Sequence, residues 1–183
     1  MKYNQVINHD KAPIFSRGIA FMIDWYVGGV LVYFPVILII NKINLGKEYT
    51  LDLRSLPFSM AVIAVSLAFI IALLYYVLIP YLLNGQTLGK KIVKLKICEL
   101  NKEKISFFSL IKRQVFGIML IEGSLFLITP LLWQAIFYKA ALYQQILTWI
   151  YYVLSVASIL MIIFSKNKKA IHDYIGNTYV IVK

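Results

Sequence analysis

The first long apolar run of this sequence contains the stretch Ser16-Arg17-Gly18-Ile19-Ala20-Phe21-Met22-Ile23-Asp24-Trp25, where an arginine and an aspartate stand among apolar residues. Arg17 and Asp24 are seven residues, or two helical turns, apart, so on a helix they share one face and stand roughly 10 Å apart along its axis. An ionisable side chain inside a bilayer is costly unless it faces protein, water or an opposite charge. Each of these two side chains therefore needs a partner of its own.

The composition is that of an integral membrane protein. Of the 183 residues, 61% are hydrophobic and 15% charged, and the mean hydropathy is +0.77, outside the range of soluble domains. A polar lead of about fifteen residues precedes the first apolar run, and that run is too long for a signal peptide, so we expect it to remain in the mature protein. The single cysteine, Cys98, excludes an internal disulfide.

Four apolar runs predict four transmembrane helices. They cover about residues 14–40, 57–83, 114–133 and 146–164, and about 20 apolar residues suffice to cross a hydrocarbon core of about 30 Å. The predicted fold class is an all-α membrane protein, a four-transmembrane-helix bundle with a basic cytoplasmic loop at 84–113 and a short C-terminal tail at 165–183. Residues 1–183 form a single domain.

The distribution of positive charge predicts the orientation. Most of the 19 lysines and arginines lie in the N-terminal lead, the 84–113 loop and the tail. The positive-inside rule therefore makes both termini and the basic loop cytoplasmic. The net charge of +11 is accounted for in this way, and because no nucleic-acid-binding motif accompanies it, we expect no nucleic-acid partner.

The start of the basic loop, Gly85-Gln86-Thr87-Leu88-Gly89-Lys90-Lys91, only superficially resembles a phosphate-binding loop. It lacks the required glycine spacing, and a membrane span and not a strand precedes it. A helix capped by Thr87 is the better interpretation, with apolar residues on one face and lysines on the other. We expect such an interfacial helix to rest on anionic headgroups, or on a partner protein, through the basic residues Lys90, Lys91, Lys94 and Arg113.

A second interpretation of this loop stays open. Apolar and polar residues alternate from Val93 to Ile97, and after Asn101-Lys102 the run Ile105–Phe107 would complete a short β-hairpin. The pattern alone does not separate a helix from a hairpin over residues 88–107.

Two carboxylates lie inside predicted spans, Asp24 in the first and Glu122 in the third. Both spans run outward from the cytoplasm, and both acids stand on the order of 10 Å from its edge at helical rise. They are therefore able to meet, and facing carboxylates suit a hard cation or a shared proton. The alternative is a structural polar lock, with an acid bonded to a neighbouring helix.

No other chemistry is expected. His172 beside Asp173 has no second His or Cys nearby, so a structural hydrogen bond is a better explanation than a metal site. Nothing marks an activated Ser or Cys, and we predict neither an enzyme nor a cofactor.

Several motifs together resemble the RDD family of bacterial membrane proteins. They are Arg17-x-x-Ala20-x-x-x-Asp24, Gly85-Gln86-Thr87-Leu88-Gly89-Lys90, Arg113, and Ile171-His172-Asp173 followed by Gly176, Thr178 and Val180. The arginine and two aspartates that name the family map to Arg17, Asp24 and Asp173. Asn177 before Thr178, and Glu122, depart from the pattern. The resemblance implies a bacterial cytoplasmic membrane and a transport role, including sodium or proton exchange.

Two functions follow as hypotheses. In the first, the protein is a small transporter or transporter subunit that moves a cation or proton through Asp24 and Glu122. We expect it to be a homo-oligomer or to join a partner membrane protein, because four spans enclose little pathway. In the second, it is a non-transporting partner or scaffold whose basic cytoplasmic face binds another protein or anionic lipid.

The tail is predicted to return to the membrane edge. Its apolar residues indicate that it docks, with the strand-like part of the basic loop as the expected partner. Asp173 would then reach Arg17 and form an ion pair that is partly shielded from water. The alternative is that Arg17 snorkels to the cytoplasmic headgroups.

Overall fold

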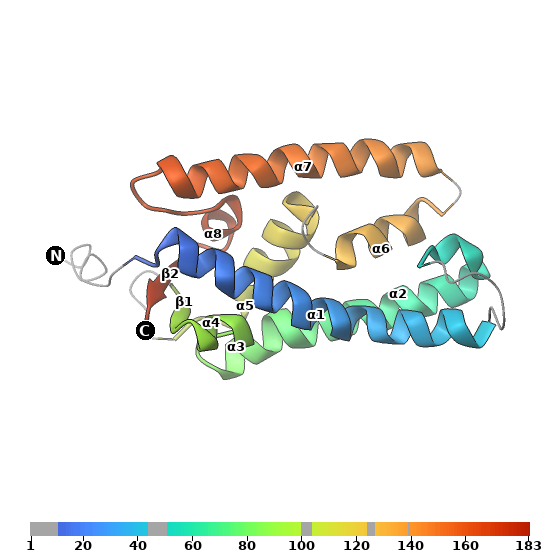
Figure 1. Cartoon of the computed structure of the whole chain (residues 1–183), viewed down its shortest axis with the longest axis horizontal. Coiled ribbons are helices and arrows are strands. Elements are labelled where there is room, and N and C mark those ends of the chain that lie inside the picture. The colour runs from blue at the N-terminus through green and yellow to red at the C-terminus, as the bar shows by residue number, and fades with distance from the viewer. Residues whose placement is uncertain (1–10, 44–50, 100–103, 124–126, 139) are drawn as a thin grey trace.

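The computed structural model describes residues 11–43, 51–99, 104–123, 127–138 and 140–183. Within these ranges, three helices are long and apolar enough to cross a membrane, namely Ile14–Ile43, Phe58–Leu82 and Leu142–Phe164. They correspond to the first, second and fourth predicted spans. In Figure 1 they are α1 (Ile14–Ile43), the stretch from α2 (Phe58–Leu73) to α3 (Ile79–Leu82), and α7 (Ala141–Phe164).

The second span changes its winding close to the cytoplasmic end predicted from the charge pattern. Between α2 and α3 lies the π-helix η3 (Leu74–Leu78). Pro80 follows it, and a proline inside a helix clashes with the carbonyl four residues earlier, here that of Tyr76. A wider turn relieves such a clash. The π-turn also buries the neighbouring Tyr75 and Tyr76.

The third predicted span, 114–133, is wrong as a continuous helix. The chain forms α5 (Phe107–Ile111), the π-helix η4 (Lys112–Ile121) and, after a break, α6 (Ile128–Ile136). The last π-turn closes from the Glu122 amide to Gly117, and Pro130 falls in the first turn of α6, where a missing N–H is tolerated. Figure 1 shows η4 and α6 as separate pieces between α7 and α2.

The basic loop and the tail combine into one unit, which includes a small sheet absent from the all-α prediction. The loop forms α4 (Leu88–Ile92) and then β1 (Leu95–Glu99), so each interpretation of 88–107 is correct in part. Strand β1 pairs antiparallel with β2 (Thr178–Val182) of the tail, as expected for a docked tail. The hairpin with 105–107 is wrong, because Ser106 caps α5 instead. Asn101 and Lys102 lie outside the described residues.

The remaining tail helix, α8 (Ile171–Ile175), lies beside this sheet at the same end of the bundle in Figure 1. The first described residue, Lys11, forms a bridge with Ile181, so the start of α1 is joined to the tail. At the other end, the short 3-10 helix η2 (Leu53–Ser55) closes the loop before α2.

Small residues bring α1 and α2 close together. One face of α2 carries four fully buried alanines, which are Ala61, Ala64, Ala68 and Ala72. They belong to one apolar core with Val32 and Val36 of α1 and Leu131 of α6. In a bilayer, where lipid is as apolar as the side chains, such close packing is a principal source of helix association. This core fixes α1 and α2 as the frame against which the polar groups are held.

Candidate functional site

A buried cluster of two arginines and one aspartate joins α1, η4 and α8. Arg17 Nη2 lies 2.6 Å from Asp173 Oδ2, and Arg17 Nη1 donates to the Lys168 carbonyl at 2.6 Å. Arg113 Nη1 donates to Asp173 Oδ1 and, at 2.9 Å, to the Thr178 hydroxyl. The expected contact between Arg17 and Asp173 is therefore present. The expectation for Arg113 is corrected, because the side chain is buried in this cluster and does not lie on the basic surface.

Asp173 remains ionised despite complete burial. Burial alone would raise the pKa of this carboxyl, but the Arg113 guanidinium, followed by His172 and Arg17, holds the pKa well below its usual range. Its Oδ2 also accepts the Ala170 amide at 3.0 Å, which caps the first turn of α8. One carboxylate thus fixes the tail helix and both arginines.

The second cluster surrounds Asp24, which is 4% exposed. Its Oδ1 accepts the Tyr75 hydroxyl at 3.0 Å and the Gly89 amide at 2.8 Å. Its Oδ2 accepts the Thr87 hydroxyl at 2.5 Å and lies 3.4 Å from Lys90 Nζ. Four donors occupy a carboxylate that has about four lone-pair sites, so the Lys90 ammonium stands where a bound cation would otherwise lie.

The lysines in and just after α4 lie in different environments. Lys90 was assigned to the polar, headgroup-facing side of the helix, and this is corrected, since its side chain turns inward to Asp24. Burial lowers the pKa of Lys90, and the Asp24 charge opposes that shift. Lys91 and Lys94 are exposed, as the interfacial interpretation expects.

Close backbone approach makes the Asp24 cluster possible. The π-turn directs two consecutive side chains, Tyr75 and Tyr76, toward α1, and the Tyr76 hydroxyl donates to the Asp24 carbonyl at 2.9 Å. A Cβ at Gly28 would lie 2.0 Å from that hydroxyl oxygen. A Cβ at Gly89 would lie 2.3 Å from a backbone oxygen of α1. Position 89 therefore requires glycine, and a side chain at position 28 would displace the Tyr76 ring.

Glu122 forms a third cluster at the break after η4. Its Oε1 accepts the Ser158 hydroxyl and the His172 amide, each at 2.8 Å, and its Oε2 lies 2.8 Å from His172 Nδ1. The Ser155 hydroxyl donates to the Glu122 carbonyl at 2.6 Å. Burial, and then the Arg113 charge, lower the pKa of His172, with Asp173 and Glu122 opposing the shift.

The predicted meeting of Asp24 and Glu122 is not found. Asp24 is bonded to groups from η3 and α4, whereas Glu122 is bonded to groups from α7 and α8. The prediction assumed two straight helices, and the break after η4 turns Glu122 away toward the tail. Neither the Glu122–His172 contact nor the inward turn of Lys90 was predicted from the sequence.

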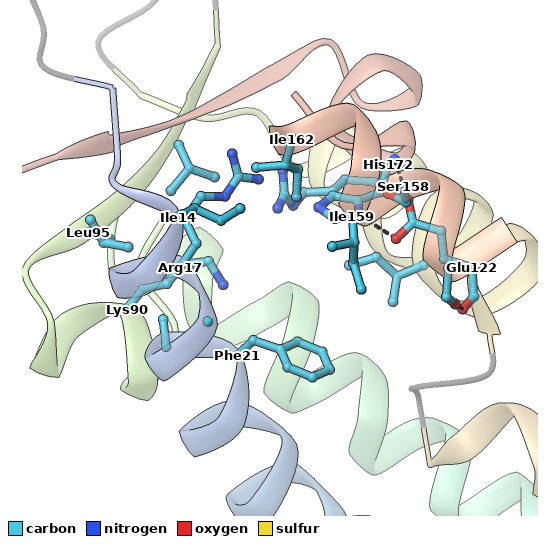
Figure 2. Close-up of a pocket in the computed structure, with 16 residues that line it drawn as sticks. Ile14, Arg17, Phe21, Lys90, Leu95, Glu122, Ser158, Ile159, Ile162 and His172 are labelled. Atoms are coloured by element: carbon cyan, nitrogen blue, oxygen red, sulfur yellow. Dashed lines mark hydrogen bonds and ion pairs between the residues drawn. The ribbon is translucent and has the colours of Figure 1, made fainter. Parts of the chain in front are cut away.

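A cavity of about 330 Å³ lies between α1 and α7. From α1 it is lined by Ile14, Arg17, Gly18, Ala20 and Phe21. From α7 it is lined by Ser155, Ser158, Ile159 and Ile162. Figure 2 shows Arg17 and Lys90 on one side of this space, and Ser158, Ile159 and Ile162 on the other. Glu122, His172 and Arg113 also line it, so with Lys90 each of the three clusters contributes a side chain to one space.

Comparison with known proteins gives one match. The family model described as the RDD family matches residues 11–177. The search of curated proteins and the search of solved structures each found no match. The matched range includes α1, the basic loop and α8, and hence all three polar clusters.

Proposed function

Because the chain belongs to the RDD family, and has apolar helices long enough to cross a membrane, we propose that it moves a proton or a small cation across the membrane. The supporting observation is the contact of Glu122 with His172 on the wall of the cavity between α1 and α7. Ionisable groups inside a bilayer typically mark ion or proton pathways. Broken helices at membrane depth are typical of transporter sites.

The two intramembrane carboxylates have different roles in this proposal. Glu122 and His172 lie 2.8 Å apart, within hydrogen-bond distance, so a proton entering from the cavity can be held by either group. Asp24 is occupied by Lys90 Nζ at 3.4 Å, and a cation reaches this carboxylate only when that ammonium withdraws. Glu122 is therefore the exchanging group, and Asp24 is a second site that Lys90 closes.

A flux measurement tests the role of Glu122. Purified protein in liposomes is expected to move protons, with or without coupled sodium, when a gradient is imposed. Glu122→Gln keeps the shape of the side chain and a carbonyl acceptor for Ser158, but it removes the ionisable group, so we expect at least a tenfold lower flux.

The matched control for this flux experiment is Asp52→Asn, which changes an exposed acid at the other end of the molecule. Its flux should equal that of the wild type. A Glu122→Gln protein that transports at the wild-type rate would remove Glu122 from the pathway. If liposomes that contain the wild-type protein are no more permeable than empty ones, the transport proposal is wrong.

That last outcome would favour a second function, a non-transporting partner or scaffold protein. The exposed Lys91 and Lys94 beside α4 favour it, since they form part of a basic face able to bind anionic headgroups or an acidic protein surface. Under either function we propose a homo-oligomer or a complex with a partner membrane protein, because so few spans enclose little pathway.

We also propose that the membrane is a bacterial cytoplasmic membrane and that both termini are cytoplasmic. The join between Lys11 and β2 supports a common side for the two ends. In a Cys98→Ser background, an impermeant maleimide should label Asp52→Cys in intact cells, but label Lys166→Cys only after permeabilisation. Lys166 is exposed, and the side chain of Asp52 is 39% exposed. The reverse pattern would invert the orientation.

A further inference from the structure

The cavity between α1 and α7 combines apolar walls with a cationic end. We propose that it binds an amphipathic anion, a hydrocarbon chain with one terminal carboxylate or phosphate group. The site goes beyond the proposed transport function, because it is defined by binding and requires no flux.

Two helices face one another across this cavity without packing together. Four of the five α1 residues on its wall occupy positions 14, 17, 18 and 21, and the α7 residues occupy positions 155, 158, 159 and 162. Each set has the i, i+3, i+4, i+7 spacing of a helix face that normally contacts another helix. At Gly18, an added Cβ would meet nothing within 4 Å. The two faces are therefore separated by open space.

The walls of this space suit a hydrocarbon chain. Ile14 and Phe21 of α1 face Ile159 and Ile162 of α7. Apolar side chains such as these favour contact with a hydrocarbon chain over contact with water. Its volume of about 330 Å³ is at the lower end of the range for small-molecule sites, which indicates one chain and not two.

The polar end carries unbalanced positive charge. Arg17 and Arg113 share the single carboxylate of Asp173, so these three groups together keep one excess positive charge. Arg17 and Arg113 both line the cavity, so this excess charge lies on its wall. Guanidinium groups bind carboxylate and phosphate oxygens, and one such group on the ligand would balance the charge.

The acid on the cavity wall does not compete for this end. Glu122 lies across the space from Lys90 in Figure 2 and accepts hydrogen bonds from Ser158 and from the amide and ring of His172. Its charge is thus held by groups of α7 and α8. The side formed by Arg17, Arg113 and Lys90 remains the cationic side.

Photocrosslinking tests the site. A diazirine-bearing long-chain fatty acid is added to the full chain in phosphatidylcholine liposomes, and the adducts are mapped by mass spectrometry. We expect saturable labelling of residues 14–21 and 155–162. Dodecanoate should compete at least tenfold better than dodecanol, which has the same chain without the charge. Equal competition by the alcohol would overturn the cationic end, and unsaturable labelling spread over the lipid-facing helices would overturn the site.

Substitutions that fill the cavity provide a second test of the site. Gly18→Phe should reduce the labelling at least tenfold, whereas Gly18→Ala, which adds one methyl group to the same open space, should stay within about twofold of wild type. Ile159→Trp fills the cavity from the opposite wall, and it replaces Gly18→Phe in this test if that variant does not fold. Unchanged labelling in a folded filling variant would contradict the assignment.

The host lipid distinguishes two sources of the ligand. If liposomes of phosphatidylglycerol suppress labelling relative to phosphatidylcholine, the natural occupant is one chain and the headgroup of an anionic membrane lipid. If they do not, the occupant is a free single-chain acid. If Glu122→Gln loses flux but is still labelled, the binding site stands without the transport function. If a variant loses labelling but keeps flux, transport stands without the binding site.

Discussion

Asp173→Ala is expected to lower the free energy of unfolding by about 3–5 kcal/mol, the range for a buried charge that loses its partner. The wild-type carboxylate is completely buried and is bonded to two guanidiniums, of which Arg113 is 3% and Arg17 11% exposed. Removing it leaves two cations facing one another and also removes the cap of α8. The loss is measured by denaturant or thermal unfolding in detergent micelles.

The matched control for Asp173→Ala is Arg54→Ala, which breaks an ion pair with Asp52 whose two side chains are both 39% exposed. Exposed pairs contribute about 0–1 kcal/mol, so this variant should be nearly as stable as wild type. In the double variant Arg17→Ala and Asp173→Ala, the loss should be smaller than the sum of the single losses. Additive losses would mean that the direct contact contributes no coupling energy.

Asp24→Ala should be the second most damaging substitution, with a loss of about 3–5 kcal/mol for the same physical reason. It leaves the Tyr75 and Thr87 hydroxyls and the Gly89 amide without their acceptor. It also leaves Lys90 without its ion-pair partner. Adding Lys90→Met to Asp24→Ala removes the unpaired ammonium, so the double variant should be more stable than Asp24→Ala alone in the same unfolding measurement.

The control for this recovery is Lys91→Met, which changes the exposed neighbour of Lys90. It should give no recovery in the Asp24→Ala background. Equal recovery by both lysine substitutions would show that general charge reduction, and not the buried pair, is responsible.

The spans that were predicted correctly have apolar runs with clear ends. Pro57 precedes α2, and Asn84 and Gly85 follow α3, so the boundaries of the second span are visible in the sequence. The third span was wrong for the converse reason. Hydropathy measures the apolar content of a segment and not the continuity of its helix, and here η4 ends at Ile121 within a run that is apolar enough to span.

The polar clusters were predicted in part. The contact of Arg17 with Asp173 could be predicted from the sequence. The tail is too apolar to remain in water, so it returns to the bundle and brings Asp173 with it. Lys90 was assigned by helical phase to the solvent side. However, Thr87 and Lys90 are three residues apart and share a face, and once Thr87 donates to Asp24 the lysine turns the same way. The contacts of Tyr75 and Tyr76 with Asp24 depend on the π-turn of η3. Pro80 is the only sequence feature that indicates this turn.

The pairing of β1 with β2 has a consequence for the order in which the protein is made. Strand β1 and the two arginines emerge from the ribosome long before β2 and Asp173. At a synthesis rate of about 5–20 residues per second, the roughly 80 residues between the strands take ~4–16 s. During this interval the first helices are already available to the insertion machinery, while Arg17 and Arg113 have no carboxylate partner from α8. This end of the bundle therefore closes only after translation has passed Val182, and a nascent chain stalled before that point leaves the edge of β1 and both arginines without their partners.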